Sequence, residues 1–372
     1  MKILFICTSL EPGRDGVGDY TRRLAGELVR QGHLSAIIAI NDKNISEKID
    51  GTQQIDNTDL PVLRLPSKWD LKDKINYAKK YISEFDPEWI SLQFVVFGFD
   101  PKGLPFGLGK KLKVLVKGRN VHVMFHELWL GMEKEADAKY LLWGMVQRQL
   151  IKSMLAKLKP KVITTHTHLY EHHLKKLPYK VIFLPLFSNI ARIENTAAPA
   201  DRANRKTIKL VLFGVIHVGC PVADFAKELA AYGQKNNVSI SLTFIGGANA
   251  AQLEIWAAEF KNQGIKVTLL GKQSPETVSE TLNNSNFGIS TTAYALAEKS
   301  SSVSVMREHG LKIISVSRPW TPKNVNDLQL PPDIFEYQTG NVETFLSDPS
   351  HFEFNHSITK VSHTLIDSFL TI

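Results

Sequence analysis

The sequence predicts an α/β protein made of two doubly wound domains in tandem. At 372 residues and 41.8 kDa the chain exceeds what one hydrophobic core usually supports. Short apolar segments of strand type alternate along it with longer segments of helical periodicity, which indicates parallel sheets covered by helices. A small and polar stretch without periodicity, residues 195–206, separates two sets of this alternation and predicts a linker.

The first domain is expected over residues 1–194, where each strand is followed by a loop or a helix. Its strands are expected at 2–8, 35–40, 62–65, 89–94, 122–125, 162–165 and 181–184. Its helices are expected at 18–31, 71–85, 104–116, 137–158 and 169–176.

The second domain is expected over residues 207–345 and repeats the same alternation. Its strands are expected at 208–213, 239–245, 266–270, 287–290 and 312–316. Its helices are expected at 221–235, 250–263, 275–283 and 302–309. The last segment, 346–372, contains the helical pattern "SITKVSHTLIDSFL".

The composition is that of a soluble globular protein, with 43% hydrophobic and 22% charged residues. No apolar run approaches the ~20 residues that span a bilayer. The start "MKILFICTSLEPG" turns polar too soon for a signal peptide, so a cytoplasmic location is expected. The two cysteines, Cys7 and Cys220, offer neither a disulfide framework nor zinc spacing, and both are expected to be small buried residues.

The formal net charge is +8, and the excess lies before residue 195, where it reaches roughly +9. Such a basic half suits nucleic acid, anionic lipid or an acidic small molecule. Basic residues gather in "GKKLKVLVKGR" and "VQRQLIKSMLAKLKPK". The second has the outline of a membrane-surface helix, and the alternative is a solvated helix packed by its apolar stripe.

In open α/β sheets ligands bind beyond the carboxyl ends of the strands. The opening loop "GRDGVGD" lies there, and the helix after it would favour an anion. It is not the dinucleotide fingerprint, since it lacks the G-x-G-x-x-G order and a Walker lysine. The alternative is a tight turn in which Asp19 caps the helix.

Three further loops combine polar side chains with strand ends. In "MFHELWLG", His126 leaves a strand and is suited to bind a sugar hydroxyl or shuttle a proton. In "ALAEKSSSVSVMREHGLKIISV", Glu298 and Lys299 precede three serines and a helix, a cluster that can hold a diphosphate or be an ordinary serine cap. In "FGVIHVGCP", Gly214 and His217 follow the first strand of the second domain.

The strand ends "FIGGAN" and "LLGKQSP" repeat the glycine pattern, and the backbone at Gly271 and Lys272 is suited to contact a nucleobase edge. The segment "HTHLYEHH" places His168 and His172 one helical turn apart, as two zinc ligands would be. No carboxylate or cysteine stands at a suitable spacing, so no metal site is predicted.

With these loops in view, the chain resembles the GT-B glycosyltransferases, and within them the large retaining family four that uses nucleotide-sugars. The likeness spans nearly the whole chain. It rests on these segments, of which the first and last are the most specific: "EPGRDGVGDYTRRLAGELVRQGH", "WISLQFVVFGFDPKGLP", "VHVMFHELW", "LPLFSNI", "LVLFGVIHVG" and "EKSSSVSVMREHGLKIISV".

The resemblance implies two Rossmann-like domains that face a cleft, with the acceptor bound by the first, the nucleotide-sugar by the second, and the closing helix crossing back to the first. It implies catalytic roles for His126 and Glu298. It implies donor contacts from Gly16, Val17, Gly18, Gly214, His217, Gly271, Lys272, Lys299, Ser300 and Ser301.

The chain departs from the family at the places of an arginine and a lysine that neutralise the leaving diphosphate, which hold Val215 and Cys220. The family also has two glutamates seven residues apart. In this chain the place of the second glutamate is held by Val305, and Glu308 is out of register with it. Lys299 and His217 are expected to supply the missing positive charge, or else the enzyme is weakened or inactive.

The expected function is transfer of a sugar from a nucleoside diphosphate sugar to a saccharide or lipid-linked acceptor, with no metal or other cofactor and no nucleic acid. The resemblance implies retention; an inverting enzyme would need a base, for which Asp15 and Asp19 are candidates. The basic half suggests an anionic membrane surface at the inner face. The alternatives are a catalytically impaired protein that binds nucleotide-sugar or glycan, and a dehydrogenase, which the missing fingerprint disfavours.

Overall fold

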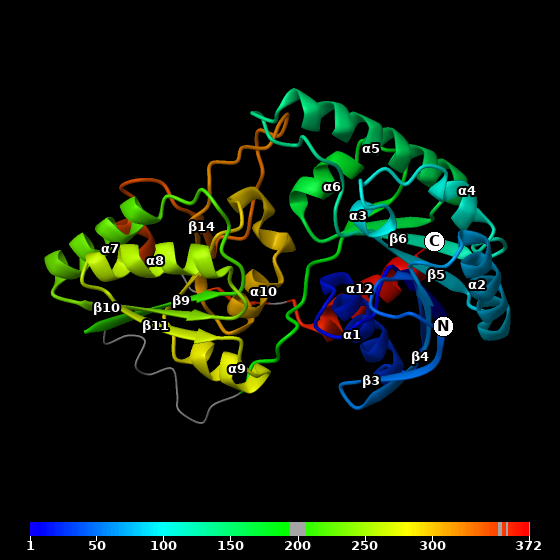
Figure 1. Cartoon of the computed structure of the whole chain (residues 1–372), viewed down its shortest axis with the longest axis horizontal. Coiled ribbons are helices and arrows are strands. Elements are labelled where there is room, and N and C mark those ends of the chain that lie inside the picture. Colours follow the sequence, from blue (N-terminus) through cyan, green and yellow to red (C-terminus); the bar gives the residue numbers. More distant parts are fainter. Residues whose placement is uncertain (194–205, 349–351, 355, 372) are drawn as a thin grey trace. The chain divides into compact units, whose positions relative to one another are not determined.

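The computed structural model describes residues 1–193, 206–348, 352–354 and 356–371, and it divides into two compact α/β units (Figure 1). Unit 1 comprises Met1–Pro185, Pro322–Asn326 and Ile358–Ile372, and unit 2 comprises Leu186–Thr321 and Asp327–Ser357. The linker expected at 195–206 lies outside the described residues except for Lys206. None of the described helices is long and apolar enough to cross a membrane.

Unit 1 is built on an eight-stranded sheet in the order β3-β4-β2-β1-β5-β6-β7-β8. All neighbouring strands pair in parallel except β3, which is antiparallel to β4 at the edge. The strands are β1 (Lys2–Cys7), β2 (Leu34–Asp42), β3 (Ile49–Ile55), β4 (Thr58–Pro66), β5 (Trp89–Phe94), β6 (Asn120–Phe125), β7 (Val162–Thr165) and β8 (Val181–Phe183). The central strand β1 reads KILFIC because both of its faces are covered.

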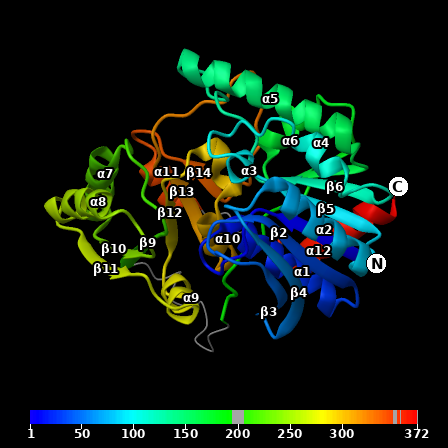
Figure 2. The same ribbon diagram turned by 45° about the vertical axis from the view of Figure 1, so that its right-hand side comes forward.

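Helices cover both faces of this sheet. They are α1 (Gly16–Arg30), α2 (Leu71–Phe85), α3 (Val96–Phe99), α4 (Leu108–Lys113), α5 (Ala138–Leu158), α6 (His168–Leu174) and α12 (Ile358–Leu370). The C-terminal helix α12 lies beside α1 (Figure 2). Its Phe369 ring stacks on Trp89 of β5 with 3.9 Å between ring centroids, and Gln31 donates to Ser362 at 2.6 Å.

Unit 2 is built on a six-stranded sheet in the order β11-β10-β9-β12-β13-β14, and its pairs are parallel. Its strands are β9 (Thr207–Phe213), β10 (Ser239–Ile245), β11 (Lys266–Gly271), β12 (Phe287–Ser290), β13 (Lys312–Ser315) and β14 (Ile334–Glu336). Its helices are α7 (Val222–Asn236), α8 (Ala250–Asn262), α9 (Pro275–Asn283), α10 (Ser301–Glu308) and α11 (Val342–Ser347), with a 3₁₀ turn at Tyr294–Lys299.

The central strand of unit 2 shows why the sheet forms two cores. Leu210 and Leu212 of β9 enter a core with Phe225 and Trp256 of the helices on one face. Val211, which lies between them in sequence, enters a second core with Met306 of α10 on the other face. Successive strand residues point to opposite faces, so a continuous apolar strand fills both cores.

The predicted fold class is confirmed, since both units are doubly wound with mainly parallel sheets. Strand β3 was not predicted because its sequence, IDGTQQI, is polar and it forms an edge. The helix expected over 104–116 is shorter, because Pro105 and Gly107, which has φ +71°, precede its true start at Leu108. The three-residue strand β14 was also missed.

In each sheet the direction of strand succession reverses at one point. In unit 1 this point lies between β1 and β5, and in unit 2 it lies between β9 and β12. Loops that leave two such neighbouring strands pass to opposite faces, which opens a crevice at their carboxyl ends. The two points therefore define where a ligand of each unit is expected.

Two of the three glycines in the opening loop, Gly16 and Gly18, differ in the space around them. A Cβ on Gly18 would lie 2.5 Å from the backbone oxygen of Ser9, whereas a Cβ on Gly16 would meet nothing within 4 Å. We expect Gly18→Ala to lower the free energy of unfolding by about 1 to 3 kcal/mol. The atoms that its Cβ would meet belong to the backbone of Ser9 and Leu10, which cannot move aside as a flexible side chain would. Gly16→Ala should change it by less than about 0.5 kcal/mol. Urea unfolding of both variants checks this, and equal midpoints would contradict it.

Candidate functional site

Three glycine turns form the carboxyl edge of the unit 2 sheet. Gly214 follows β9, Gly246 follows β10, and Gly271 is the last residue of β11; their φ values are +99°, +107° and +66°. The Gly214 amide donates to the Ile245 carbonyl at 2.9 Å, and the Gly246 amide donates to the Gly271 carbonyl at 2.7 Å. These left-handed conformations suit glycine, so the edge presents backbone without side chains to an approaching ligand.

The first turn of α10 lies against the first of these glycines. Ser300 caps the helix by accepting the Val303 amide at 3.4 Å, and its hydroxyl is 3.0 Å from that of Ser302. A Cβ on Gly214 would lie 3.2 Å from the Cβ of Ser302. The strand end of β9 and the helix start of α10 therefore form one surface, where helix amides and hydroxyls can bind an anion.

His217 is held at the point where the strand order of unit 2 reverses. The Thr291 hydroxyl donates to the Val215 carbonyl at 3.0 Å and accepts the His217 amide at 3.0 Å. The single hydrogen of the Thr291 hydroxyl is used in the bond to Val215. His217 Nδ1, which is 2.9 Å from the same hydroxyl, must therefore be the donor, and Nε2 of that ring is left as an acceptor.

The surroundings of His217 do not favour a positive charge on its ring. Burial lowers the pKa of His217, the hydrogen bond to Thr291 opposes this in part, and the Lys299 ammonium lowers the pKa further. The ring is therefore neutral at pH 7. A neutral ring can accept a hydroxyl hydrogen at Nε2.

Of the other residues predicted for this edge, Lys299 is close enough to act on His217, and Ser301 is exposed on the first turn of α10. Lys272 extends beside the β10 turn, with its Cε 3.0 Å from where a Cβ on Gly247 would lie. Glu298 is largely buried in the 3₁₀ turn, where its carboxylate helps to raise the pKa of Tyr294, mainly raised by burial.

Sequence reasoning missed four residues of this edge. Thr291, Ser302 and Gly246 each directly follow a predicted strand or begin a predicted helix, and that position was the available signal. The fourth, Arg318, follows β13 and is exposed; its Cβ lies 3.7 Å from where a Cβ on Gly219 would be. It adds a cationic residue beside the loop that contains Val215 and Cys220.

In unit 1 the opening loop is organised by its own carboxylates. The helix cap is Asp15, which accepts the Gly18 amide at 2.8 Å, so the alternative of an Asp19 cap is wrong. Asp19 accepts the Gly13 amide at 3.1 Å and pairs with Arg22. Gly18 is buried against the Ser9 backbone, Val17 is half-buried, and Gly16 is the residue of the three that borders open space.

His126 ends a chain of buried polar groups on the sheet face beneath α1 and α12. Gln93 donates to Ser91 at 2.8 Å and accepts from His126 Nε2 at 2.9 Å, which leaves Nδ1 of that ring as its acceptor. Tyr20 of α1 packs edge-on against His126 with 5.0 Å between centroids. Burial, with the neighbouring His166 and His122, holds the pKa of His126 well below its usual value.

The chain continues from Ser91 to His122, whose Nδ1 is 2.8 Å from the Ser91 hydroxyl. His122 Nε2 is 2.8 Å from Thr164 Oγ1, which in turn donates to the Met124 sulfur. Thr164 must then accept from Nε2, and Nδ1 must accept from Ser91. Each hydrogen bond of this chain then has one donor and one acceptor with both rings neutral, and Nδ1 of His126 is left as an acceptor.

The histidine-rich segment has packing roles in the structure. The His168 ring stacks on Phe183 at 4.0 Å, and the rings of His172 and His173 are 5.5 Å apart. Across the described residues, no group of three or more His, Cys, Asp or Glu is arranged to hold a metal ion. Cys7 is buried as expected, whereas Cys220 is only half-buried.

No protein-family model matches the chain, and no curated protein matches it in sequence. Solved structures do match it over its full length. HepE from Anabaena, in complex with UDP and glucose, has a TM-score of 0.58 at 12% identity, with 100% of both chains covered. The lipopolysaccharide outer core galactosyltransferase WaaB in its apo form has a TM-score of 0.57 at 13% identity, with 100% of this chain and 99% of that chain covered.

The UDP-GlcNAc 2-epimerase from Methanocaldococcus jannaschii also matches, with a TM-score of 0.53 at 8% identity and 100% of both chains covered. Identities this low establish the fold alone. The fold is GT-B, two Rossmann-like α/β units, as the sequence predicted.

The buried histidine chain makes stability depend on pH. Burial lowers the pKa of His122 to about 3 in the folded protein, against about 6.5 when unfolded. The neutral His122 ring therefore contributes fully to the free energy of unfolding above about pH 6.5. That contribution is lost progressively as the pH falls toward 3. Between pH 7 and 4.5 we expect a loss of about 2 to 3 kcal/mol in the free energy of unfolding from this residue.

Urea unfolding across this pH range checks the expectation. His122→Gln should be less stable at pH 7 but should lose less stability on acidification than the parent chain. His363→Gln, at an exposed histidine of α12, is the matched control and should follow the parent. An identical pH slope for His122→Gln and the parent would refute the assignment.

Proposed function

We propose that the chain is a glycosyltransferase that moves a sugar from a nucleoside diphosphate sugar to an acceptor. The observation that carries this is the proximity of Gly214 to Ser302, which places a bare glycine turn beside the start of α10 where the strand order reverses. Lys299 directly precedes Ser300, the cap of that helix. In the proposal, the first-turn amides and hydroxyls of α10 and the Lys299 ammonium surround the diphosphate.

The leaving diphosphate is the main electrostatic difficulty of such a reaction, and preorganised donors must stabilise its charge. In the proposal, the first-turn amides of α10, the hydroxyls of Ser300 and Ser301, and Lys299 take this role without a metal. Arg318 adds a second cation beside the loop where Val215 and Cys220 replace the cations of the resembling family. Neutral His217 and the Glu298 carboxylate accept hydroxyl hydrogens of the donor.

Unit 1 holds the acceptor in this proposal. His126 is neutral and offers Nδ1 to a sugar hydroxyl. Asp15 and Asp19 are both engaged within their own loop, which argues against either as the base of an inverting reaction. Retention, which needs no dedicated protein base, is therefore the outcome we propose.

The donor to test first is a uridine diphosphate sugar. HepE, with which the chain shares its fold, was solved with UDP and glucose. A protein that binds such a donor without turning it over is the alternative, which the uncharged Val215 and Cys220 favour. The fold is also that of a UDP-GlcNAc 2-epimerase, so the assay must separate sugar transfer from epimerisation.

We expect UDP to bind the purified protein and Lys299→Gln to weaken binding about 10-fold or more, because a charge-assisted contact is lost. Glu298→Gln should leave UDP affinity nearly unchanged while abolishing release of UDP from the productive UDP-sugar. Calorimetry with UDP and an assay of UDP release, repeated with a metal chelator, measure these effects.

Lys266→Gln is the matched control, since it removes an exposed lysine from the opposite end of β11. UDP affinity that is the same in Lys299→Gln and in this control would overturn the proposed diphosphate site. Tight binding with no release of UDP from any sugar donor would support the binding protein, and an epimeric UDP-sugar as product would support the epimerase.

A further inference from the structure

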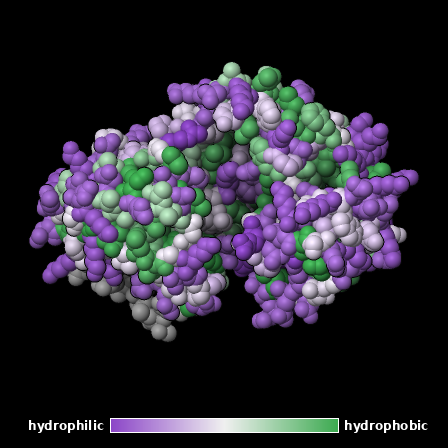
Figure 3. Space-filling view, in the orientation of Figure 1, coloured by the Kyte–Doolittle hydropathy of each residue, from purple (hydrophilic) through white to green (hydrophobic). Residues whose placement is uncertain are grey.

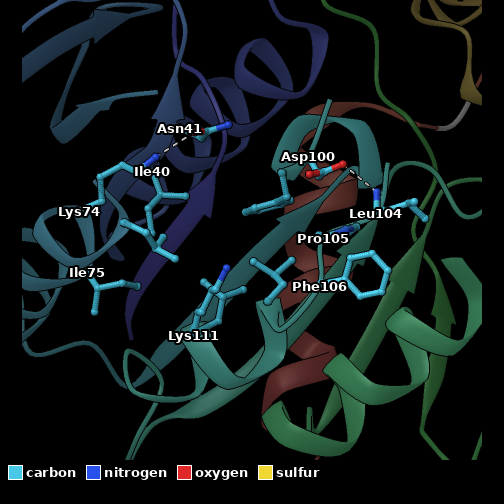
Figure 4. A pocket seen from close by; sticks show the side chains of 13 residues that line it. Ile40, Asn41, Lys74, Ile75, Asp100, Leu104, Pro105, Phe106 and Lys111 are labelled. Atoms are coloured by element: carbon cyan, nitrogen blue, oxygen red, sulfur yellow. Dashed lines mark hydrogen bonds between the residues drawn. The ribbon is translucent and has the colours of Figure 1, made fainter. Parts of the chain in front are cut away.

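Unit 1 contains a pocket of about 260 Å³ that the donor site does not use (Figure 4). It lies where β2 ends, between α2 and the segment that leads from α3 into α4. Its volume is at the small end of ligand sites, which commonly hold about 300 to 1,000 Å³. A small ligand, or the end of a longer one, would fill it.

A buried ammonium forms part of its wall. Lys74 of α2 is only 6% exposed, and its Nζ donates to the Asn41 side-chain oxygen at 3.1 Å and to the Ser67 carbonyl at 3.3 Å. Both partners are uncharged, and in the described part of the chain Lys74 forms no ion pair. An ammonium has three donors, and buried charges are normally paired, so an anion is the partner that this lysine lacks.

A second ammonium, that of Lys111 on α4, lies on the same pocket. Burial lowers the pKa of Lys74, and the charge of Lys111 lowers it further, so the two cations repel each other. An anion between them would replace repulsion by attraction to both. Asn41 is held in place by its own bond to the Gly98 carbonyl at 3.0 Å, so the polar wall is preorganised.

The pocket also contains one carboxylate, that of Asp100. Its Oδ1 accepts the amides of Lys102 and Leu104, both at 2.9 Å, and so it fixes the loop that forms the opposite wall. Figure 4 shows the bond from the Leu104 amide to Asp100 on one side of the pocket and the bond from Lys74 to Asn41 on the other. The lysines are thus left to an incoming ligand.

The remaining wall is apolar and extends to the surface. Phe99 and Leu104 line it, and Phe106 at its edge is 63% exposed. The loop before Leu104 is anchored to α5, because Trp143 donates to the Lys102 carbonyl at 2.8 Å and Gln147 donates to the Gly103 carbonyl at 3.1 Å.

The same helix carries large exposed apolar side chains near that loop, among them Leu142 and Met145. Hydrophobic and hydrophilic residues are mixed along α5, at the upper edge of the view in Figure 3. A ligand with a charged end between the lysines would therefore have apolar surface to follow on its way out.

We propose that this pocket binds an alkyl phosphate monoester, with the phosphate between Lys74 and Lys111 and the alkyl chain along Phe99, Leu104 and Phe106. A monoester carries close to two negative charges at pH 7, which match the two ammonium groups. The site lies wholly within unit 1, and binding there goes beyond the proposed function and does not require it. The ligand is either a free amphiphile or the headgroup of a phospholipid.

The test uses the full chain and octyl phosphate below its micelle concentration, followed by calorimetry at pH 7.5. We expect it to bind at least 10-fold more tightly than inorganic phosphate or octanol, since each of these lacks one half of the ligand. Lys111→Gln should weaken octyl phosphate binding at least 5-fold and leave UDP binding unchanged. This lysine is exposed, so the fold should tolerate the change.

Lys110→Gln is the matched control, because this residue is exposed on the same helix and does not line the pocket. Lys74→Met should weaken binding further, and its thermal unfolding shows whether the fold is kept. Equal affinity of Lys111→Gln and Lys110→Gln for octyl phosphate, or equal affinity of the protein for octyl phosphate and inorganic phosphate, would overturn the proposal.

Vesicles distinguish the two sources of the ligand. Flotation with vesicles that contain phosphatidic acid, but not with vesicles of equal charge that contain phosphatidylglycerol, identifies a lipid headgroup, provided that Lys111→Gln abolishes it. Octyl phosphate binding without vesicle flotation identifies a free amphiphile. Either result supports the pocket, whereas no binding of octyl phosphate overturns it even if UDP binds as proposed.

Discussion

The reversal of strand order in each sheet is the constraint on which the rest of this structure depends. Parallel strands must be joined by crossovers, and right-handed crossovers from neighbouring strands leave toward opposite faces only where the order reverses. In unit 2 this separates the loop after β9 from the loop after β12 and leaves Gly214, His217 and Thr291 around one opening. In unit 1 the same geometry separates the loops after β1 and β5.

Burial then decides which of the polar groups near these openings are charged. His126 and His217 are both neutral because burial disfavours the imidazolium, so they can orient hydroxyl groups without attracting anions. Positive charge is left to side chains that reach solvent or a cavity, such as Lys299 and Arg318 in unit 2 and Lys111 in unit 1.

Most elements could be predicted from the sequence, because apolar periodicity reports directly on which side chains are buried. The strand predicted at 208–213 is β9 within one residue, and the helix predicted at 302–309 is α10 within one residue at each end. Errors arose where burial gives no signal. Strand β3 is polar on both faces. The sequence offered Asp19 as an alternative cap of α1, whereas Asp15, three residues before Gly18, is the residue whose side chain accepts the Gly18 amide.

The sequence by itself determined the alternation of strands and helices, the two parallel sheets, and the places where glycine turns and serine-rich helix starts follow strands, because these depend on neighbours along the chain. Only the tertiary structure decided that Gly214 lies beside Ser302, that Thr291 fixes the tautomer of His217, and that Lys74 and Lys111 share one pocket. Each of these depends on the distance between segments remote in sequence, and on how much water that packing excludes.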